Sequence, residues 1–213
     1  GFLMLVSEYF TKLSYGQFRN VSAGLEGIGQ IKDETKNTIV GYMQDALIQL
    51  YTRFNLLEKV AIVQQHSHIT NYHLDKRYAK FNPDRPPENY GYIIDLPAEP
   101  FNNDAVKILR VHDMQGCERV LNDTDDCYGY GTPFSTTLFI PNPVNNEYVS
   151  IVYQALHPKL EFGVYNTPIN IPNSLDNAFL TYVAYSFYRD MNTDTTSVKS
   201  QEHLAAYEMI CAK

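Results

Sequence analysis

The strongest constraint on the fold lies in the last part of the chain, residues 171–213. They are typical of two helices separated by the polar break MNTDTT, which offers N-cap residues for the second helix. Pro172, with Asn173 or Ser174, marks the start of the first helix. The apolar residues of that helix surround most of its axis: Phe179, Leu180, Tyr182, Val183, Ala184, Tyr185, Phe187 and Tyr188. A helix without a broad polar side is buried on more than one side, and in a chain of 213 residues we expect one side to contact another subunit.

Composition indicates an ordered globular protein. Hydrophobic residues make up 44% of the chain and charged residues 19%, which excludes a disordered chain. Seventeen tyrosines and no tryptophan form an unusual aromatic set. Tyrosine suits half-buried and interface positions, and it equally suits strands and cores, so both interpretations stay open.

The net charge of −7 and the absence of a Lys/Arg stripe argue against a surface that holds nucleic acid. Cys117, Cys127 and Cys211 show no CxxC spacing, so we expect free thiols in a reducing compartment. A Cys117–Cys127 bridge across a hairpin is the less favoured alternative.

The N-terminal segment is amphipathic. Its apolar residues fit one face of a helix: Phe2, Leu5, Val6, Tyr9, Phe10 and Leu13. Because Ser7, Glu8 and Lys12 break this run, it is neither a signal core nor a membrane span, and we expect a soluble protein. The glycines that follow, at 24, 27 and 29, predict a turn-rich linker and not a dinucleotide-binding loop.

The clearest helix covers about residues 34–54, with Asp33 as its cap. One apolar stripe runs along it: Ile39, Val40, Met43, Ala46, Leu47, Leu50, Tyr51 and Phe54. This pattern predicts a helix with a single face toward the core.

The middle of the chain predicts β-structure. Expected strands cover residues 60–63, 106–111, 136–140 and 148–153, in an antiparallel meander. A proline-rich excursion over residues 75–105, with a strand fragment at 92–94, is expected to contact a neighbour.

The order of these elements predicts an α+β fold, with N- and C-terminal helices on either side of a central antiparallel β-rich insertion. The expected segments are residues 1–57 for the first helices, 58–170 for the insertion with its long loop, and 171–213 for the closing helices. The absence of βαβ alternation disfavours a nucleotide-binding α/β fold.

Three histidines, His66, His68 and His73, are the first candidate for chemistry. Two histidines at i and i+2 lie on one face of a strand, which is one geometry for a zinc pair. Further ligands are not evident in the sequence, so a hairpin tip with polar histidines is the favoured interpretation. A small metal-dependent hydrolase that uses His66 and His68 remains the alternative function.

The acidic turn at Asn122, Asp123, Asp125 and Asp126 loosely resembles a calcium loop. It lacks the glycine and the distal glutamate of an EF-hand, and Asx turns explain it more simply. Since no nucleophile or phosphate-binding motif is present either, we predict no catalytic, cofactor-binding or metal-binding residue and no enzymatic activity.

Three blocks of the sequence resemble the head-to-tail adaptors of short-tailed bacteriophages, the group of tail tubular A proteins. The first is IVGYMQDALIQLYTRFNLLEKVAIV at residues 39–63. The second joins VKILRVHDMQGCERVLND at 106–123 with LFIPNP at 138–143 and VSIVYQALHP at 149–158. The third is INIPNSLDNAFLTYVAYSFYRDMNT at 169–193 with the closing SQEHLAAYEMICAK at 200–213.

The resemblance implies a helical bundle that is made from the N- and C-terminal segments and carries the β-rich insertion. It also implies a virion protein, assembled in the host cytoplasm, that forms a ring of commonly about twelve copies. Such a ring lies between the portal protein and the tail nozzle protein, and it extends the channel for double-stranded DNA without sequence-specific binding. In a ring each copy buries two different faces. A ring of chains that each carry a charge of −7 would also repel DNA phosphates, so that DNA would pass through the channel without binding to its wall.

Overall fold

The computed structural model describes residues 3–16, 18, 31 and 33–213, so the predicted glycine linker lies outside the described residues. The chain divides into two compact units. The helical unit joins Gly1–Arg53 to His157–Lys213, and the β unit is Phe54–Leu156. The segment from His157 onward therefore belongs with the helices, although the sequence placed residues up to 170 in the β region.

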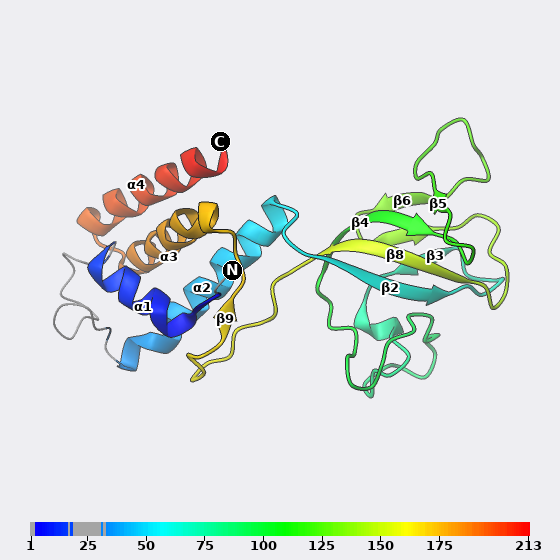
Figure 1. The fold of residues 1–213 in the computed structure, drawn as a ribbon, viewed down its shortest axis with the longest axis horizontal. Helices are drawn as coiled ribbons and strands as arrows, with labels where there is room; N and C mark the ends of the chain where they lie inside the picture. The colour runs from blue at the N-terminus through cyan, green and yellow to red at the C-terminus, as the bar shows by residue number, and fades with distance from the viewer. Residues whose placement is uncertain (1–2, 17, 19–30, 32) are drawn as a thin grey trace. The chain divides into compact units, whose positions relative to one another are not determined.

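The helical unit contains four helices among its described residues, and Figure 1 shows their arrangement. Their bounds are α1 Val6–Tyr15, α2 Asp33–Arg53, α3 Asp176–Met191 and α4 Asp194–Cys211. A short 3-10 turn, η2 at Asn173–Leu175, precedes α3. The predicted positions of α2 and of the closing helix pair are confirmed, because local apolar periodicity decides them.

Helix α3 is the centre of the helical unit. It packs along α4 and α2 and also contacts α1. Its Phe179 ring lies edge-on to Tyr9 of α1 at 4.9 Å, and its Tyr182 ring lies 5.0 Å from Tyr207 of α4. Most of its apolar sides are therefore covered by helices of the same chain. The apolar residues around its axis do not require another subunit to explain them.

Two polar contacts also join α1 to α3. The Tyr9 hydroxyl donates to Asp176 at 2.6 Å, and Lys12 pairs with the same carboxylate at 3.0 Å.

Helix α4 begins with a capping box, in which Thr193 accepts the backbone N–H of Thr196 at 3.2 Å. The N-cap predicted within MNTDTT is thus confirmed.

The β unit contains seven strands among its described residues. Their bounds are β2 Glu58–Gln64, β3 Asn71–His73, β4 Ala105–His112, β5 Glu118–Arg119, β6 Gly131–Phe134, β7 Thr137–Phe139 and β8 Tyr148–Ala155. They form a four-stranded antiparallel sheet in the order β2-β8-β4-β5 and a three-stranded sheet in the order β3-β7-β6. Figure 1 shows β8 between β2 and β4.

One hydrophobic cluster draws on both sheets of the β unit. Val63 of β2 and Ile151 of β8 are fully buried in it, together with Tyr72 of β3 and Leu138 of β7. Along β2, Ala61 and Val63 face this cluster while Val60 and Ile62 are exposed. The alternation is that of a sheet with one face on the core and one face open.

The predicted fold, a bundle of terminal helices around one central β insertion, is wrong. The structure is α+β, with four helices and three antiparallel sheets in its described part. The helices do not form a plain bundle, because β1 (Met4–Leu5) pairs with β9 (Pro168–Ile169) inside the helical unit. The middle of the chain is mostly β, and it forms two sheets and not a meander, because β8 returns between β2 and β4.

The proline-rich excursion is anchored to the β unit at its middle. Ile93 forms bridges with Val63 and with Ala79. The Asp95 carboxylate accepts the backbone N–H groups of Phe81 and Phe101, each at 3.0 Å. The short turn η1 at Lys76–Tyr78 lies at its start. Within the described residues, no helix is long and apolar enough to cross a membrane.

Candidate interaction surfaces

The three histidines predicted as a cluster separate in the structure. His66 and His68 lie in the connection between β2 and β3 and not on a strand, so they do not share the strand face that the zinc alternative requires. Strands β2 and β3 do not pair, so this connection is not the tip of a hairpin either. Their ring centroids are 6.0 Å apart, and both rings contact Tyr90, at 5.1 Å and 4.8 Å. Burial, with His68 nearby, lowers the pKa of His66. His73 lies in β3, where its Nδ1 is 2.9 Å from the Thr137 hydroxyl.

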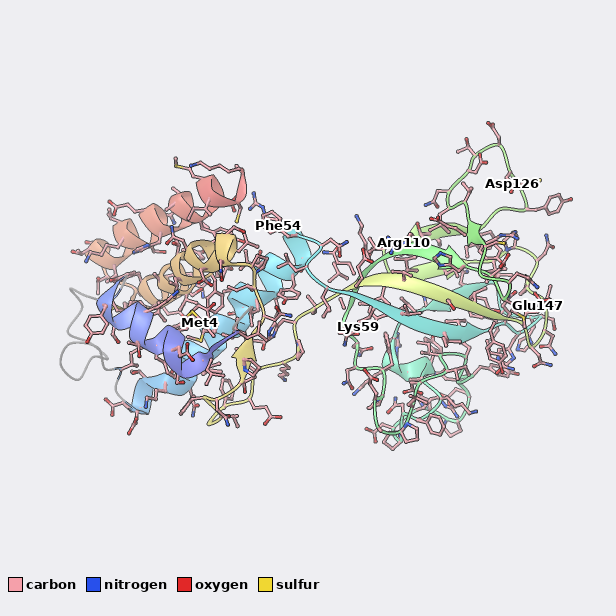
Figure 2. All side chains as sticks on the ribbon, viewed as in Figure 1. Met4, Phe54, Lys59, Arg110, Asp126 and Glu147 are labelled. Atoms are coloured by element: carbon pink, nitrogen blue, oxygen red, sulfur yellow. The ribbon has the colours of Figure 1, made fainter. Side chains whose placement is uncertain are left out.

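The acidic turn consists of Asx turns, as the sequence favoured. Asp123 accepts the backbone N–H of Asp125, and Asp126 accepts that of Tyr128, each at 3.0 Å. Figure 2 shows Asp126 on the loop between β5 and β6. Among the described residues, no group of three His, Cys, Asp or Glu side chains is placed to hold a metal ion. Cys117 and Cys127 are exposed free thiols, and Cys211 is a buried one.

An apolar groove of about 630 Å³ lies on the helical unit, between α2 and the segment 159–162. Two hydrogen bonds hold this segment to α2. The Gln44 side chain accepts the backbone N–H of Leu160 at 2.7 Å, and Asn37 accepts that of Gly163 at 2.8 Å. The Phe162 ring is 69% exposed at the rim of this α2 groove.

Gly41 forms part of the floor of the α2 groove. A Cβ atom at this position would lie 3.9 Å from Cε1 of Phe162, which is ordinary contact. Glycine inside a helix costs about 1 kcal/mol relative to alanine. Alanine would therefore fit at position 41 and stabilise the helix, and its methyl group would narrow the groove slightly. At the same surface, the Tyr42 hydroxyl donates to Asp190 of α3 at 2.8 Å, and burial raises the pKa of Tyr42 to about 12.

A second groove, of about 570 Å³, lies on the β unit beside β2. Strand β2 forms one wall, and the excursion from Ile93 to Asp104 forms the other. At one end Lys59 pairs with Asp104 at 2.6 Å, and Figure 2 places Lys59 at the start of β2. We call this space the β2 groove.

The outer face of β2 carries apolar side chains that the described part of the chain leaves open. Val60 is 61% exposed and Ile62 is 41% exposed. Their cross-strand partners on β8 are Val152 and Ser150. The solvent face of an antiparallel sheet is ordinarily polar, so this pair of β-branched residues is a candidate for contact with another molecule.

No protein-family model matches the chain, and no curated protein shows significant similarity to it.

Neither groove was found in the sequence. The α2 groove lies mostly beside the predicted apolar stripe of α2, which contributes only Val40 to it, and local periodicity does not reveal a contact between residues 41 and 162. For the β2 groove a signal was present. Val60-Ala61-Ile62-Val63 is apolar on both faces, as in a strand buried on both sides, yet the structure covers only one of them.

Proposed function

We propose that this chain is a structural virion protein, a ring-forming head-to-tail adaptor that joins the portal protein to the tail nozzle protein and extends the DNA channel. The observation that carries the proposal is that each compact unit has its own apolar groove, one beside α2 and one beside β2. A ring requires two different faces on every copy, because a head-to-tail contact joins unlike surfaces.

Two features of the sequence support the same assignment. The three blocks that resemble the adaptors of short-tailed bacteriophages span most of the chain, from residue 39 to residue 213. A net charge of −7 suits a channel through which DNA passes without being held. The partners are then further copies of the chain, the portal protein and the nozzle protein.

The test is the mass of the assembled particle. Native mass spectrometry and electron microscopy of the chain, alone and mixed with the portal protein, should reveal a closed cyclic ring. Twelve copies of a 24.4 kDa chain have a mass of about 293 kDa. A chain that stays monomeric both alone and with portal protein would contradict the proposal.

Two matched substitutions connect the ring to the α2 groove. Phe162→Glu places a charge at the rim of the α2 groove and should weaken assembly at least tenfold. A tenfold change in the association constant corresponds to about 1.4 kcal/mol of association free energy. Val198→Glu is the control, because Val198 is 60% exposed on α4 and lines neither groove. Equal assembly of the two variants would remove the α2 groove from the proposed ring contact.

A further inference from the structure

We infer that the open edge of β2 binds an extended segment of a partner chain by strand addition, so that the partner adds a strand to the four-stranded sheet. The inference rests on the proposed function only in treating the β2 groove as a contact surface. It specifies the chemistry of the occupant: an extended backbone, apolar side chains at every second position, and a lysine or arginine.

The edge of β2 already accepts a strand over part of its length. The chain's own segment 92–94 forms an antiparallel bridge there, between Ile93 and Val63. The Ile94 N–H donates to the Ile62 carbonyl at 2.8 Å, and the Gln64 N–H donates to the Tyr92 carbonyl at 2.8 Å. The backbone of β2 from Ile62 to Gln64 therefore has the geometry for antiparallel pairing at this edge.

No strand of the described residues pairs with the other half of the edge. The backbone groups of Ile62 and Gln64 point away from β8, so in an antiparallel strand those of Val60 point the same way. After Ile94 the chain leaves β2, because the Asp95 carboxylate binds the backbone of Phe81 and Phe101 instead. An incoming strand can continue from the place where the chain's own segment ends.

The β2 groove gives this incoming strand room and a floor. A volume of about 570 Å³ falls in the range of clefts that bind ligands. The groove is lined by Ala61 and Tyr153, which face the core, and by Phe101, whose ring lies 6.0 Å from that of Tyr153. Alternate side chains of the added strand meet this apolar lining, and the remaining ones lie beside Val60.

The charge of the groove selects a basic occupant. Three carboxylates line it, those of Asp95, Glu99 and Asp104, against the one ammonium of Lys59, for a formal charge of −2, although Asp95 is buried and accepts two backbone N–H groups. Lys59 already pairs with Asp104. A lysine or arginine of the partner near Glu99 therefore complements the groove.

The opposite edge of the same sheet lacks these properties. Strand β5 is two residues long, and both residues, Glu118 and Arg119, are charged and exposed. Short and charged edge strands resist the addition of further strands. The unpaired half of the β2 edge also begins with charged residues, Glu58 and Lys59, but these are neutralised in ion pairs with Arg110 and Asp104, and Val60 beside them is 61% exposed.

A synthetic peptide of alternating lysine and valine residues, labelled with a fluorophore, is the probe. Fluorescence anisotropy with the full chain should show saturable binding. The same peptide with N-methyl groups on alternate amides should bind at least tenfold more weakly, because it cannot form the edge hydrogen bonds. A peptide with glutamate in place of lysine should also bind more weakly, and more so at low salt.

Variants of the chain test the same contacts from the other side. Val60→Pro removes the N–H group at the open edge without removing a bond to β8, and should weaken peptide binding at least fivefold. Val60→Thr keeps the backbone donor and should bind within about twofold of the parent chain. Glu99→Gln should reduce the salt dependence of binding while the unfolding curve stays unchanged.

Equal binding of the N-methylated and unmodified peptides would overturn strand addition, as would a folded chain that binds neither peptide. These outcomes are separate from those of the assembly experiment. A ring that forms with portal protein while the peptide fails to bind contradicts strand addition alone. A chain that binds the peptide but stays monomeric with portal protein contradicts the adaptor proposal alone.

Discussion

Helix α3 and strand β2 are both rich in apolar residues, yet the chain covers them differently. Around α3, helices α1, α2 and α4 of the same chain fill most of the apolar sides. On β2, one face lies on the core, and the other carries Val60 and Ile62 in the open. The two segments show that apolar sequence alone does not indicate exposure: the described chain covers the helix and leaves Val60 and Ile62 of the strand exposed, which is why we propose the strand as the contact surface.

The largest expected effect tests whether the apolar side chains of α3 are buried by the other helices of the same chain. Replacing Phe179, which is fully buried against Tyr9, with alanine should lower the free energy of unfolding by about 3 to 5 kcal/mol. Urea unfolding followed by the helical circular dichroism signal measures it. Phe162→Ala is the matched control, with an expected loss below about 0.5 kcal/mol. Similar losses in both variants would contradict a covered α3.

The next test separates the two faces of β2 with neighbouring residues. Val63→Thr buries a hydroxyl in the core and should cost about 1 to 3 kcal/mol in the free energy of unfolding. Ile62→Thr makes a comparable change on the open face and should cost less than about 0.5 kcal/mol. Equal losses of unfolding free energy in the two variants would contradict an exposed outer face of β2.

Local structure could be predicted because its causes are local. The stripe from Ile39 to Tyr51 repeats at helical spacing, and α2 forms where the sequence predicts it. Thr193 supplies the cap expected for α4. The strand at 148–155 was also expected close to its observed place.

Pairing could not be predicted, because it joins residues far apart in the sequence. Nothing near Met4 indicates that it pairs with Ile169, and a two-residue strand leaves no periodicity. Likewise, β8 pairs with both β2 and β4, which excludes the expected meander, through contacts such as Val60 with Val152. Strand β2 pairs with β8 on one side and with segment 92–94 over part of the other, so the location of its unpaired half depends on long-range pairing that the sequence does not reveal.

A third test uses a polar atom inside α3. Ser186 is 1% exposed, and its hydroxyl has no hydrogen-bond partner among the described residues. An unsatisfied buried hydroxyl costs about 1 to 3 kcal/mol. Ser186→Ala should therefore raise the free energy of unfolding by about 1 kcal/mol, measured by the same urea titration. A loss of stability would mean that the hydroxyl is satisfied in solution, and that this side of α3 is not closed.

The smallest effect concerns the segment after β8, which supplies β9 and one wall of the α2 groove. His157 holds this segment, because its Nε2 accepts the Asn170 N–H at 3.1 Å and its Nδ1–H donates to the Pro158 carbonyl at 2.7 Å. The bond from Asn170 requires the neutral ring, because a protonated Nε2 cannot accept, whereas the bond to Pro158 forms in either protonation state. Burial lowers the pKa of His157, while the bond to Pro158 opposes the change.

Since the folded chain prefers neutral His157, the resulting stability is complete above the unfolded value near 6.5 and is lost as the pH falls toward the lowered pKa. The free energy of unfolding of the helical unit should therefore decrease from about pH 7.5 to about pH 5.5. His157→Gln should flatten this slope, whereas His68→Gln, at an exposed turn, should keep it. His203 also has a pKa lowered by burial, so the slope should shrink and not vanish. An unchanged slope in His157→Gln would contradict the role of the ring, and the cover of α2 would then depend on the Gln44 and Asn37 contacts instead.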